Sequence, residues 1–290
     1  MSGGLSTAFI LERELNVLNF SCPVCGSPLN ATPVLYECPN RHFFDRARSG
    51  YVNLLQRQRH RTRGDDADMV RARRSFLETG FYEPLRSELT KTVCEIAPAE
   101  ILDVGCGEGW YSCHILKELK ERTNEAFLSG VDISPEALRY AANRAKQMDL
   151  DRQSAWAVAS VSRLPFSDHS CDCILNLFAP CEPKEFHRIL RSDGCLIRAI
   201  PLEKHLWELK CAVYEQPYQN RPNLSAPEGF KVADMKRVDS VITVSGEDLT
   251  NLFSMTPYAH KTSVSDSAKL DTIQSMDITI SFGIMKCVVA

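Results

Sequence analysis

The sequence predicts an α/β protein in which a small cysteine-rich module precedes a mostly parallel sheet of seven strands flanked by helices. Three observations lead to this prediction. Apolar runs and amphipathic helical segments alternate from Ile101 onward, which is typical of a parallel sheet with helices on both faces. The C-terminal part adds two β-rich runs that suit an antiparallel pair. Residues 21–55 are rich in Cys, Pro, Gly and aromatic residues without a helical period, as expected of a module too small to fold without a staple.

The alternation defines the expected elements in order. Parallel strands are expected at 101–104, 128–133, 156–159, 172–178 and 195–200. Helices are expected at 110–121, 135–147, 183–190 and 204–215. The antiparallel pair is expected at 239–244 and 278–288, around a short helix at 247–253. Apolar spacing over residues 66–94 is helical but is interrupted at Gly80 and Pro84, which predicts two helices separated by a turn.

Composition narrows the class of protein. With 34 Lys and Arg, 37 Asp and Glu and 44% hydrophobic residues, the chain resembles ordinary globular proteins and not collagen, coiled coils or disordered chains. It lacks both a signal peptide and the roughly 18 uninterrupted apolar residues of a membrane helix, so we expect a cytoplasmic protein without a membrane segment. Its 12 Cys are therefore expected to be thiols or metal ligands.

Four residues at the start of the chain have the spacing of a zinc site. Cys22-Pro-Val-Cys25 is followed, after 12 residues, by Cys38-Pro-Asn-Arg-His42. Two close pairs of soft or borderline ligands can converge tetrahedrally on Zn²⁺, each pair on a tight loop. The alternative is buried free thiols with an unrelated His. The other cysteines lack such spacing, and we expect no metal at Cys106 or at Cys171 and Cys173.

Residues 41–63 carry seven Arg and a single acid, Asp45. The planar guanidinium group fits phosphate better than an ammonium group does, and it also stacks on bases. This Arg strip therefore predicts a phosphate-binding surface, with a merely solvated face as the alternative. Its members are Arg41, Arg46, Arg48, Arg57, Arg59, Arg61 and Arg63.

A glycine-rich loop follows the first expected parallel strand. Its spacing, Asp103-Val-Gly105-Cys-Gly107-Glu-Gly109, differs from the G-x-G-x-x-G of dinucleotide-binding proteins. Glycines here let the backbone turn sharply and approach a nucleoside. The leading acid favours a cofactor without pyrophosphate whose cationic methionine portion needs a carboxylate nearby. Asp132 ends the next strand, where a carboxylate can bind both ribose hydroxyls.

Together these motifs resemble the family of large-subunit rRNA guanine-N1 methyltransferases, which includes the tylosin-resistance enzymes. The resemblance runs from about residue 20 to the C-terminus. It is carried by Phe20-Ser-Cys-Pro-Val-Cys25, Cys38-Pro-Asn-Arg-His-Phe-Phe-Asp45, Ser49-Gly-Tyr-Val-Asn-Leu-Leu55, Arg73-Arg-Ser-Phe-Leu-Glu-Thr-Gly80, Leu102-Asp-Val-Gly-Cys-Gly-Glu-Gly109, Arg163-Leu-Pro-Phe-Ser-Asp168 and Ala179-Pro-Cys181.

The resemblance implies a class I S-adenosylmethionine-dependent methyltransferase, Rossmann-like, with an N-terminal zinc module that recognises RNA. It implies methylation of guanine N1 in a domain II hairpin of 23S rRNA, a link to macrolide resistance, and a homodimer. It carries cofactor contacts onto Tyr82, Gly107, Glu108 and His205, beside Asp103, Gly105, Gly109 and Asp132 from the strand-end argument. The expected segments are an extension at 1–20, the zinc module and Arg-rich connector at 21–64, and the methyltransferase domain with its helical lead-in at 65–290.

The sequence does not assign a general base for the proton on guanine N1. The candidates are Asp45, Asp65, Asp66 and Glu182, and each is more often a helix cap or a solvated charge. A base in folded RNA must be flipped into the pocket to react. Its candidate stacking partners are Phe43, Phe44, Tyr51 and Phe178. Two alternatives remain: a small-molecule methyltransferase of the quinone-pathway type, and a non-enzymatic rRNA-binding protein.

Overall fold

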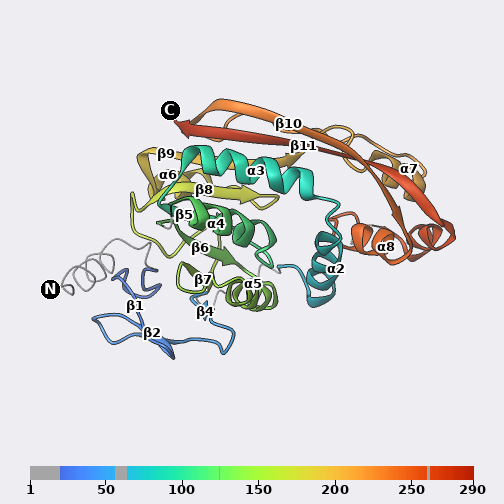
Figure 1. The fold of residues 1–290 in the computed structure, drawn as a ribbon. Helices are drawn as coiled ribbons and strands as arrows, with labels where there is room; N and C mark the ends of the chain where they lie inside the picture. Colours follow the sequence, from blue (N-terminus) through green and yellow to red (C-terminus); the bar gives the residue numbers. More distant parts are fainter. Residues whose placement is uncertain (1–19, 56–63, 124, 260–261) are drawn as a thin grey trace.

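An extended sheet runs through the centre of the protein in the computed structural model (Figure 1). The structure describes residues 20–55, 64–123, 125–259 and 262–290. Within these residues the main sheet has eight strands in the order β10-β11-β9-β8-β5-β6-β7-β4. Their bounds are β4 (Val52–Asn53), β5 (Glu100–Val104), β6 (Phe127–Asp132), β7 (Ser154–Val158), β8 (Cys171–Leu177), β9 (Leu190–Pro201), β10 (Phe230–Ser245) and β11 (Ser275–Val289).

Strands β7, β6, β5, β8 and β9 are parallel to their neighbours, whereas β11 pairs antiparallel with β9 and β10 pairs antiparallel with β11. The predicted layout of five parallel strands and a late antiparallel pair is thereby confirmed. The predicted range of 239–244 is too short for β10. The strand begins at Phe230 and pairs along the full length of β11. Its first residues are mostly polar or exposed, so they show no apolar alternation in the sequence.

An eighth strand was not expected. β4 pairs parallel with β7 in the register Val52↔Ala157 and Asn53↔Val158, and the Leu54 N–H donates to the Val158 carbonyl at 3.0 Å. Two residues are too few for any period to be visible in a sequence. The N-terminal module therefore contributes a strand to the edge of the main sheet, which the prediction of seven strands missed.

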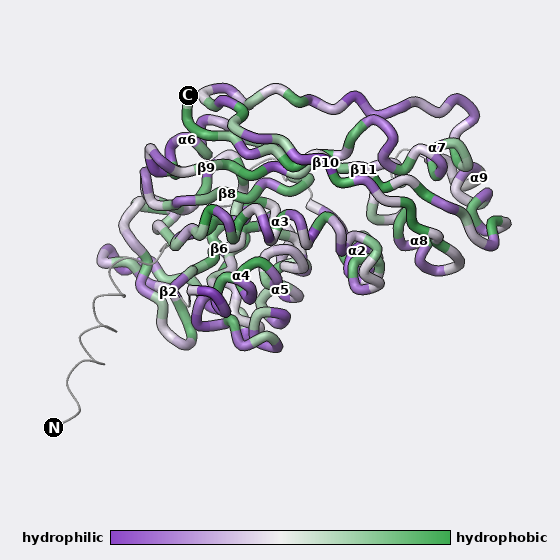
Figure 2. Tube along the Cα trace, turned by 45° about the horizontal axis from the view of Figure 1, so that its top comes forward, coloured by the Kyte–Doolittle hydropathy of each residue, from purple (hydrophilic) through white to green (hydrophobic). Residues whose placement is uncertain are grey.

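Helices α3 (Glu83–Ile96), α4 (Trp110–Thr123) and α5 (Pro135–Gln147) lie in front of the sheet in Figure 1. Their buried side chains form one core with alternate strand residues such as Ile101. Leu102, on the opposite face of the same strand, belongs to a second core, because successive side chains of a strand point to opposite faces. Figure 2 shows the hydrophobic residues concentrated along β8 and β9.

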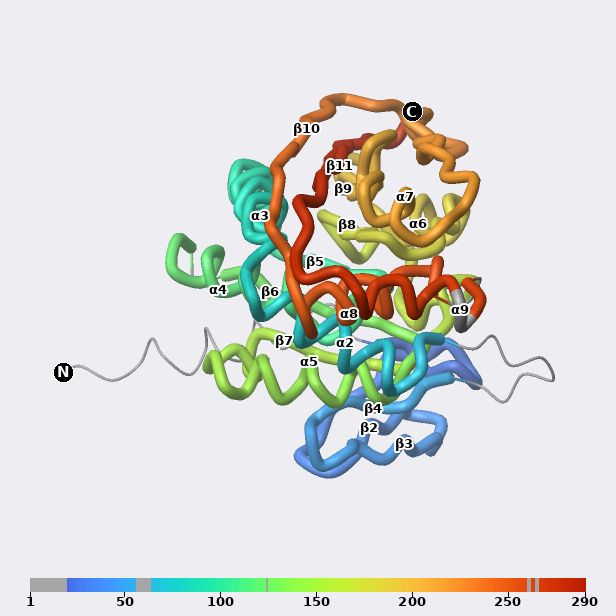
Figure 3. The backbone as a smooth tube through the Cα atoms, turned by 90° about the vertical axis from the view of Figure 1, so that its right-hand side faces the viewer, coloured from blue at the N-terminus to red at the C-terminus, as the bar shows by residue number. Residues whose placement is uncertain are grey.

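The second core joins the main sheet to the N-terminal module. Phe20, Leu29 and Tyr36 of the module are buried in the same cluster as Phe186 of α6 (Pro183–Ile189). The module itself is a three-stranded antiparallel sheet, and it lies beyond β7 and β4 in Figure 3. Its strands are β1 (Asn30–Ala31), β2 (Leu35–Glu37) and β3 (Phe43–Asp45).

Two helices lead into the main sheet, as predicted. α2 (Ala67–Glu78) is capped by Asp66, whose carboxylate accepts the Met69 N–H at 2.9 Å. After this helix, Gly80 turns the chain toward α3 with φ 84°. α7 (Trp207–Val213) is shorter than the predicted helix at 204–215. The backbone of Leu206 is in the left-handed conformation and that of Tyr214 is extended, so neither residue continues the helix. The remaining helices are α8 (Gly246–Ser254), α9 (Val264–Ser267) and η2 (Ala268–Thr272).

No helix among the described residues combines the length and the apolar character needed to cross a membrane.

Candidate functional site

The two strand-end motifs meet at the carboxyl edge of the sheet. Because β5 and β6 are adjacent and parallel, the loop after β5 reaches Asp132 at the end of β6. The Gly107 N–H donates to one Asp132 carboxylate oxygen at 3.0 Å, and the Ser134 N–H donates to the other at 2.8 Å. Each oxygen keeps a further lone pair, so the carboxylate can still accept hydroxyl groups.

The glycines of the loop serve different purposes. Gly105 and Gly109 have φ near +79° and +73°, and an added Cβ would lie 2.3 Å from Ala179 Cβ at the first position and 3.0 Å from Ala141 Cβ at the second. Gly107 has φ +55° but no neighbouring atom within 4 Å of an added Cβ. Packing therefore requires the outer two glycines, whereas the middle one leaves space that a nucleoside can approach.

Asp103 is 1% exposed. The Ser112 hydroxyl donates to its Oδ2 atom, whereas Oδ1 has no hydrogen-bond partner among the described residues. Burial raises the pKa of Asp103 to about 7, although the Ser112 hydrogen bond opposes this shift. A buried acceptor without a partner costs free energy, and a cationic ligand group would both satisfy it and keep it ionised. The unpartnered carboxylate oxygen of Asp103 fits the cationic amino group in the methionine portion of S-adenosylmethionine.

Tyr82 and His205 come together around Phe282. The ring of Phe282 lies 5.1 Å from Tyr82 and 4.2 Å from His205, between ring centroids. The Ser281 N–H donates to His205 Nδ1 at 3.3 Å, and burial lowers the pKa of His205 to about 3. The imidazole is thus neutral at physiological pH, with the proton assigned to Nε2.

Phe178 links this aromatic group to the cofactor loop. It follows β8 in a left-handed conformation with φ 60°, is 46% exposed, and lies 5.2 Å from Phe282 and 6.4 Å from Tyr111. Tyr111 comes directly after the loop on α4, and its buried hydroxyl has no hydrogen-bond partner among the described residues. Sequence reasoning missed Tyr111, although its position two residues after Gly109 was a usable signal.

The candidate zinc ligands converge in the N-terminal module. Among the described residues, Cys22, Cys25, Cys38 and His42 form the group of potential ligands whose donor atoms all lie within 4.8 Å of one another. His42 Nδ1 is 3.5 Å from Cys22 Sγ and 3.3 Å from Cys38 Sγ, and the Cys25 and Cys38 sulfurs are 3.7 Å apart. Ligands of tetrahedral zinc are about 3.5 to 3.8 Å from one another, so the arrangement fits the ion.

The thiols of this group differ in their environment. Hydrogen bonding, first from the Asn40 side chain, lowers the pKa of the exposed Cys25 to about 5, whereas burial raises the pKa of Cys22. Cys171 and Cys173 are buried in β8, and neither they nor Cys106 belong to a group of potential metal ligands in the described part of the chain.

The Arg strip is described only in part. Arg41 and Arg48 are exposed, and Arg46 donates to the Gly50 carbonyl at 2.9 Å, which commits that side chain to the turn before β4. The other four Arg, at positions 57, 59, 61 and 63, lie outside the described residues.

The four candidate bases take structural or exposed positions. Asp66 caps α2 and Asp65 pairs with Arg73, whereas Asp45 on β3 and Glu182 before α6 are exposed. The four candidate stacking residues lie in two different parts of the structure. Phe43, Phe44 and Tyr51 belong to the module and the turn before β4, whereas Phe178 lies beside the rings of Tyr111 and Phe282.

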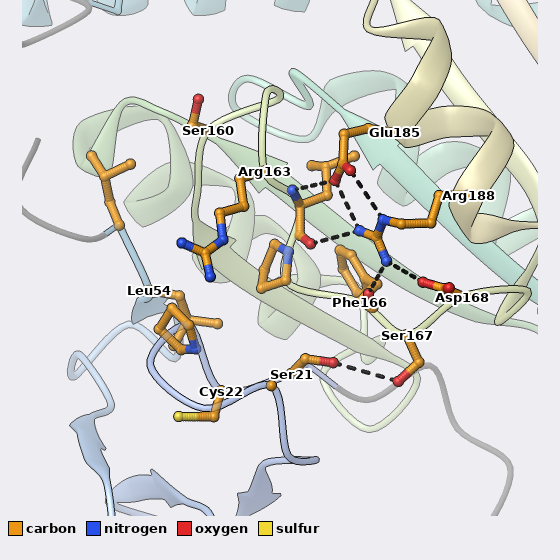
Figure 4. A pocket seen from close by; sticks show the side chains of 15 residues that line it. Ser21, Cys22, Leu54, Ser160, Arg163, Phe166, Ser167, Asp168, Glu185 and Arg188 are labelled. Carbon is orange, nitrogen blue, oxygen red and sulfur yellow. Dashed lines mark hydrogen bonds and ion pairs between the residues drawn. The ribbon is translucent and has the colours of Figure 1, made fainter.

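A cavity of about 400 Å³ marks the seam between the module and the main sheet (Figure 4). The Ser21 N–H donates to the Pro165 carbonyl at 2.7 Å, and Arg188 binds Glu185 and Asp168 across the far wall. The Ser21 bond ties the zinc module to the loop after β7. The cavity is separate from the glycine loop, which contributes no lining residue to it.

Comparison with known proteins supplies the family. Residues 20–63 match the family described as RlmA, N-terminal, and residues 101–194 match a methyltransferase domain. A putative 23S rRNA (guanine-N(1)-)-methyltransferase, YxjB of Bacillus subtilis, is 31% identical over 95% of this chain and 99% of its own length. The 23S rRNA (guanine(748)-N(1))-methyltransferase of Streptomyces fradiae is 38% identical over 67% of this chain and 68% of its own.

Similarity to a small-molecule enzyme is confined to part of the chain. The ubiquinone/menaquinone biosynthesis C-methyltransferase UbiE of Rickettsia felis is 29% identical over 45% of this chain and 55% of its own length. YxjB, which aligns over 95% of this chain, spans both the zinc ligands and the methyltransferase domain. With its zinc module and cofactor loop in one fold, the chain belongs to the family of 23S rRNA (guanine-N1)-methyltransferases.

Proposed function

We propose that this protein transfers a methyl group from S-adenosylmethionine to N1 of a guanine in a domain II hairpin of 23S rRNA. The observation that carries the proposal is the similarity to YxjB over 95% of the chain, zinc ligands and cofactor loop included. A small-molecule methyltransferase accounts for the loop but not for the zinc ligands. A non-enzymatic RNA-binding protein accounts for the zinc ligands but not for an intact cofactor loop.

The edge of the sheet provides the cofactor site. We assign Asp132 to the ribose hydroxyls and Gly107, with its open side, to the closest backbone approach. Asp103 holds the cationic amino group through its unpartnered oxygen, and Tyr82, Glu108 and His205 complete the walls, with Gly105 and Gly109 shaping the loop. S-adenosylmethionine supplies an electrophilic methyl group on a sulfonium. The protein aligns guanine N1 with that methyl and excludes water.

The target base needs a platform outside the RNA stack. Phe178 is exposed, lies next to the aromatic group of Tyr82 and Phe282, and can stack on a flipped guanine. Neutral His205 is not a cation that would repel the sulfonium. Methylation releases the N1 proton, which passes to solvent water, and none of the four candidate carboxylates is assigned to accept it.

RNA recognition is assigned to residues 21–64, where zinc holds the loops of Cys22, Cys25, Cys38 and His42 in place. The exposed Arg41 and Arg48 extend from this module, and the connector adds four more Arg. We further propose that the enzyme acts as a homodimer in the cytoplasm.

Changing Arg57, Arg59, Arg61 and Arg63 together to Gln is expected to weaken binding to 23S rRNA fragments and to flatten its salt dependence. Each phosphate neutralised contributes about 0.7 to 0.9 to the slope of log K against log salt. S-adenosylmethionine affinity should not change. Filter binding over a salt series measures the slope. An unchanged slope would indicate that these arginines form only a solvated face and do not bind phosphate.

Labelled methyl transfer tests the function itself. Unmodified 23S rRNA should accept the methyl group, whereas a quinone precursor should not. Label on the quinone precursor alone would support the small-molecule alternative. Binding of rRNA without any binding of S-adenosylmethionine in calorimetry would support the non-enzymatic one.

A further inference from the structure

The chain segment just after the Arg-rich connector is fixed against the cofactor site. Gly64 packs on the loop after β6 so closely that an added Cβ would lie 2.4 Å from Ile133 Cγ2. The Ser134 hydroxyl donates to the Asp65 carbonyl at 3.3 Å. The next residue, Asp66, caps α2, so this helix begins next to the residues that follow Asp132.

Arg73 reaches back from α2 to this anchor and forms an ion pair with Asp65. From Asp65, a series of hydrogen bonds leads to the cofactor loop. Ser134 binds Asp65 through its hydroxyl and Asp132 through its N–H. Asp132 in turn accepts the Gly107 N–H. The Arg73 side chain is 27% exposed and that of Asp65 is 35% exposed, so solvent only partly screens this pair.

We propose that Arg73 is a positioning residue of the S-adenosylmethionine site, acting through Asp65 and Ser134 on Asp132. The inference rests on the proposed function, because it concerns the carboxylate assigned to the ribose. It assigns the Arg73 guanidinium a role outside the cofactor motifs. The segment that begins at Gly64 is thereby joined to the cofactor loop.

The charge of Arg73 also bears on the acids around the loop. Burial raises the pKa of Glu108, and Arg73 is the foremost group opposing that shift. Burial also raises the pKa of Asp132, where the Ser134 and Gly107 N–H groups and the charge of Arg73 act in the opposite direction. Arg73 stays protonated, because Asp65 and Glu108 outweigh the effect of its own burial on its pKa. A ribose hydroxyl donates best to an ionised carboxylate.

The neighbouring arginine provides a matched control. Arg74 is on the same helix but stacks on Tyr140, with its guanidinium carbon 4.6 Å from the ring centroid. It makes no ion pair among the described residues. Arg74→Gln removes the same charge from the same helix without touching the Asp65 anchor.

The test is the pH dependence of S-adenosylmethionine affinity, measured by calorimetry on the full-length protein. Arg73→Gln should weaken binding about tenfold near neutral pH. As pH falls, Asp132 and Glu108 bind protons, and without Arg73 their pKa values are higher, so affinity should be lost from a higher pH than in the wild type. Arg73→Lys should restore the wild-type profile in part, and Arg74→Gln should match the wild type.

Among the groups near these acids, only Arg73 differs between the wild type and the Arg73 variants. The charged and titratable groups around Asp132 and Glu108 are Asp65, Arg73, Asp103, Cys106, Tyr111 and Arg144. Burial and the Ser112 hydrogen bond are the largest influences on the pKa of Asp103, and the charges of Asp132 and Glu108 raise it further. Arg73 therefore reaches the pH profile through Asp132 and Glu108, and the difference between the profiles of the wild type and Arg73→Gln reports this effect.

Asp65→Asn separates positioning from charge. The negative charge of Asp65 raises the pKa of Asp132, so its removal should move the loss of affinity to lower pH. Loss of the ion pair with Arg73 should nevertheless weaken binding severalfold on the high-pH plateau. This variant also serves if Arg73→Gln does not fold.

Two results would overturn the inference in distinguishable ways. Wild-type protein that does not bind S-adenosylmethionine would remove the proposed function and this inference with it. Wild-type protein that binds, together with folded Arg73→Gln and Asp65→Asn variants of unchanged affinity at every pH, would remove this inference alone.

Discussion

Replacing Cys25 with Ala is expected to reduce the zinc content from about one ion per chain to near zero. Cys25 is the exposed ligand of the group, so its removal leaves no cavity in the core, and the effect reports the metal. Structural zinc contributes about 10 to 16 kcal/mol of apparent binding free energy in zinc-finger peptides. Without the ion, the three-stranded sheet of the module should unfold locally and RNA binding should fall.

The cofactor site should largely survive this loss. The glycine loop and Asp132 belong to the main sheet, whose first core is built by α3, α4 and α5. The second core includes Phe20, Leu29 and Tyr36 of the module, so thermal stability should decrease even where affinity does not. Metal analysis with calorimetry measures both quantities. Cys211→Ala, at an exposed cysteine outside the zinc ligands, is the control, and unchanged zinc in the Cys25 variant would contradict the assignment.

Asp103→Asn and Asp132→Ala are each expected to weaken S-adenosylmethionine binding by about 1 to 3 kcal/mol, the scale of a charge-assisted hydrogen bond. Asp103 offers an unpartnered buried oxygen. Its pKa is raised to about 7, so it takes up a proton as pH falls through that value. Affinity of the wild type should therefore decrease below about pH 7, and the Asn variant should lose that part of the dependence.

Calorimetry at several pH values checks this expectation. Asp151→Asn, at an exposed acid, provides a control of equal charge change. Wild-type affinity in both the Asp103 and Asp132 variants would place the cofactor elsewhere in the protein.

The sequence predicted the central sheet well, because its strands are buried on both faces and appear as apolar runs between amphipathic helices. It predicted less at the edges. β4 is too short to show a period. The first nine residues of β10, before position 239, are mostly polar or exposed and were therefore not predicted as strand.

The candidate site divides in the same way. Cys22, Cys25, Cys38 and His42 are close in sequence, so spacing alone brought them together. Tyr82 and His205 contact each other and Phe282 of β11. These long-range contacts have no local signature in the sequence, and the selection of both residues depended on family resemblance. The link from Arg73 to Asp132 passes through a backbone carbonyl of Asp65 and an N–H of Ser134, which no side-chain motif records.

The central claim is methylation of guanine N1 in 23S rRNA, and a reverse-transcription stop tests it most directly, because a methyl group at N1 blocks Watson–Crick pairing. Ribosomal RNA from a strain lacking this protein should be read through the domain II hairpin. Wild-type protein should restore a stop one nucleotide before a single guanine, whereas the Asp132→Ala variant should restore it weakly. Identical read-through with and without the protein, or a stop at another base, would contradict the account.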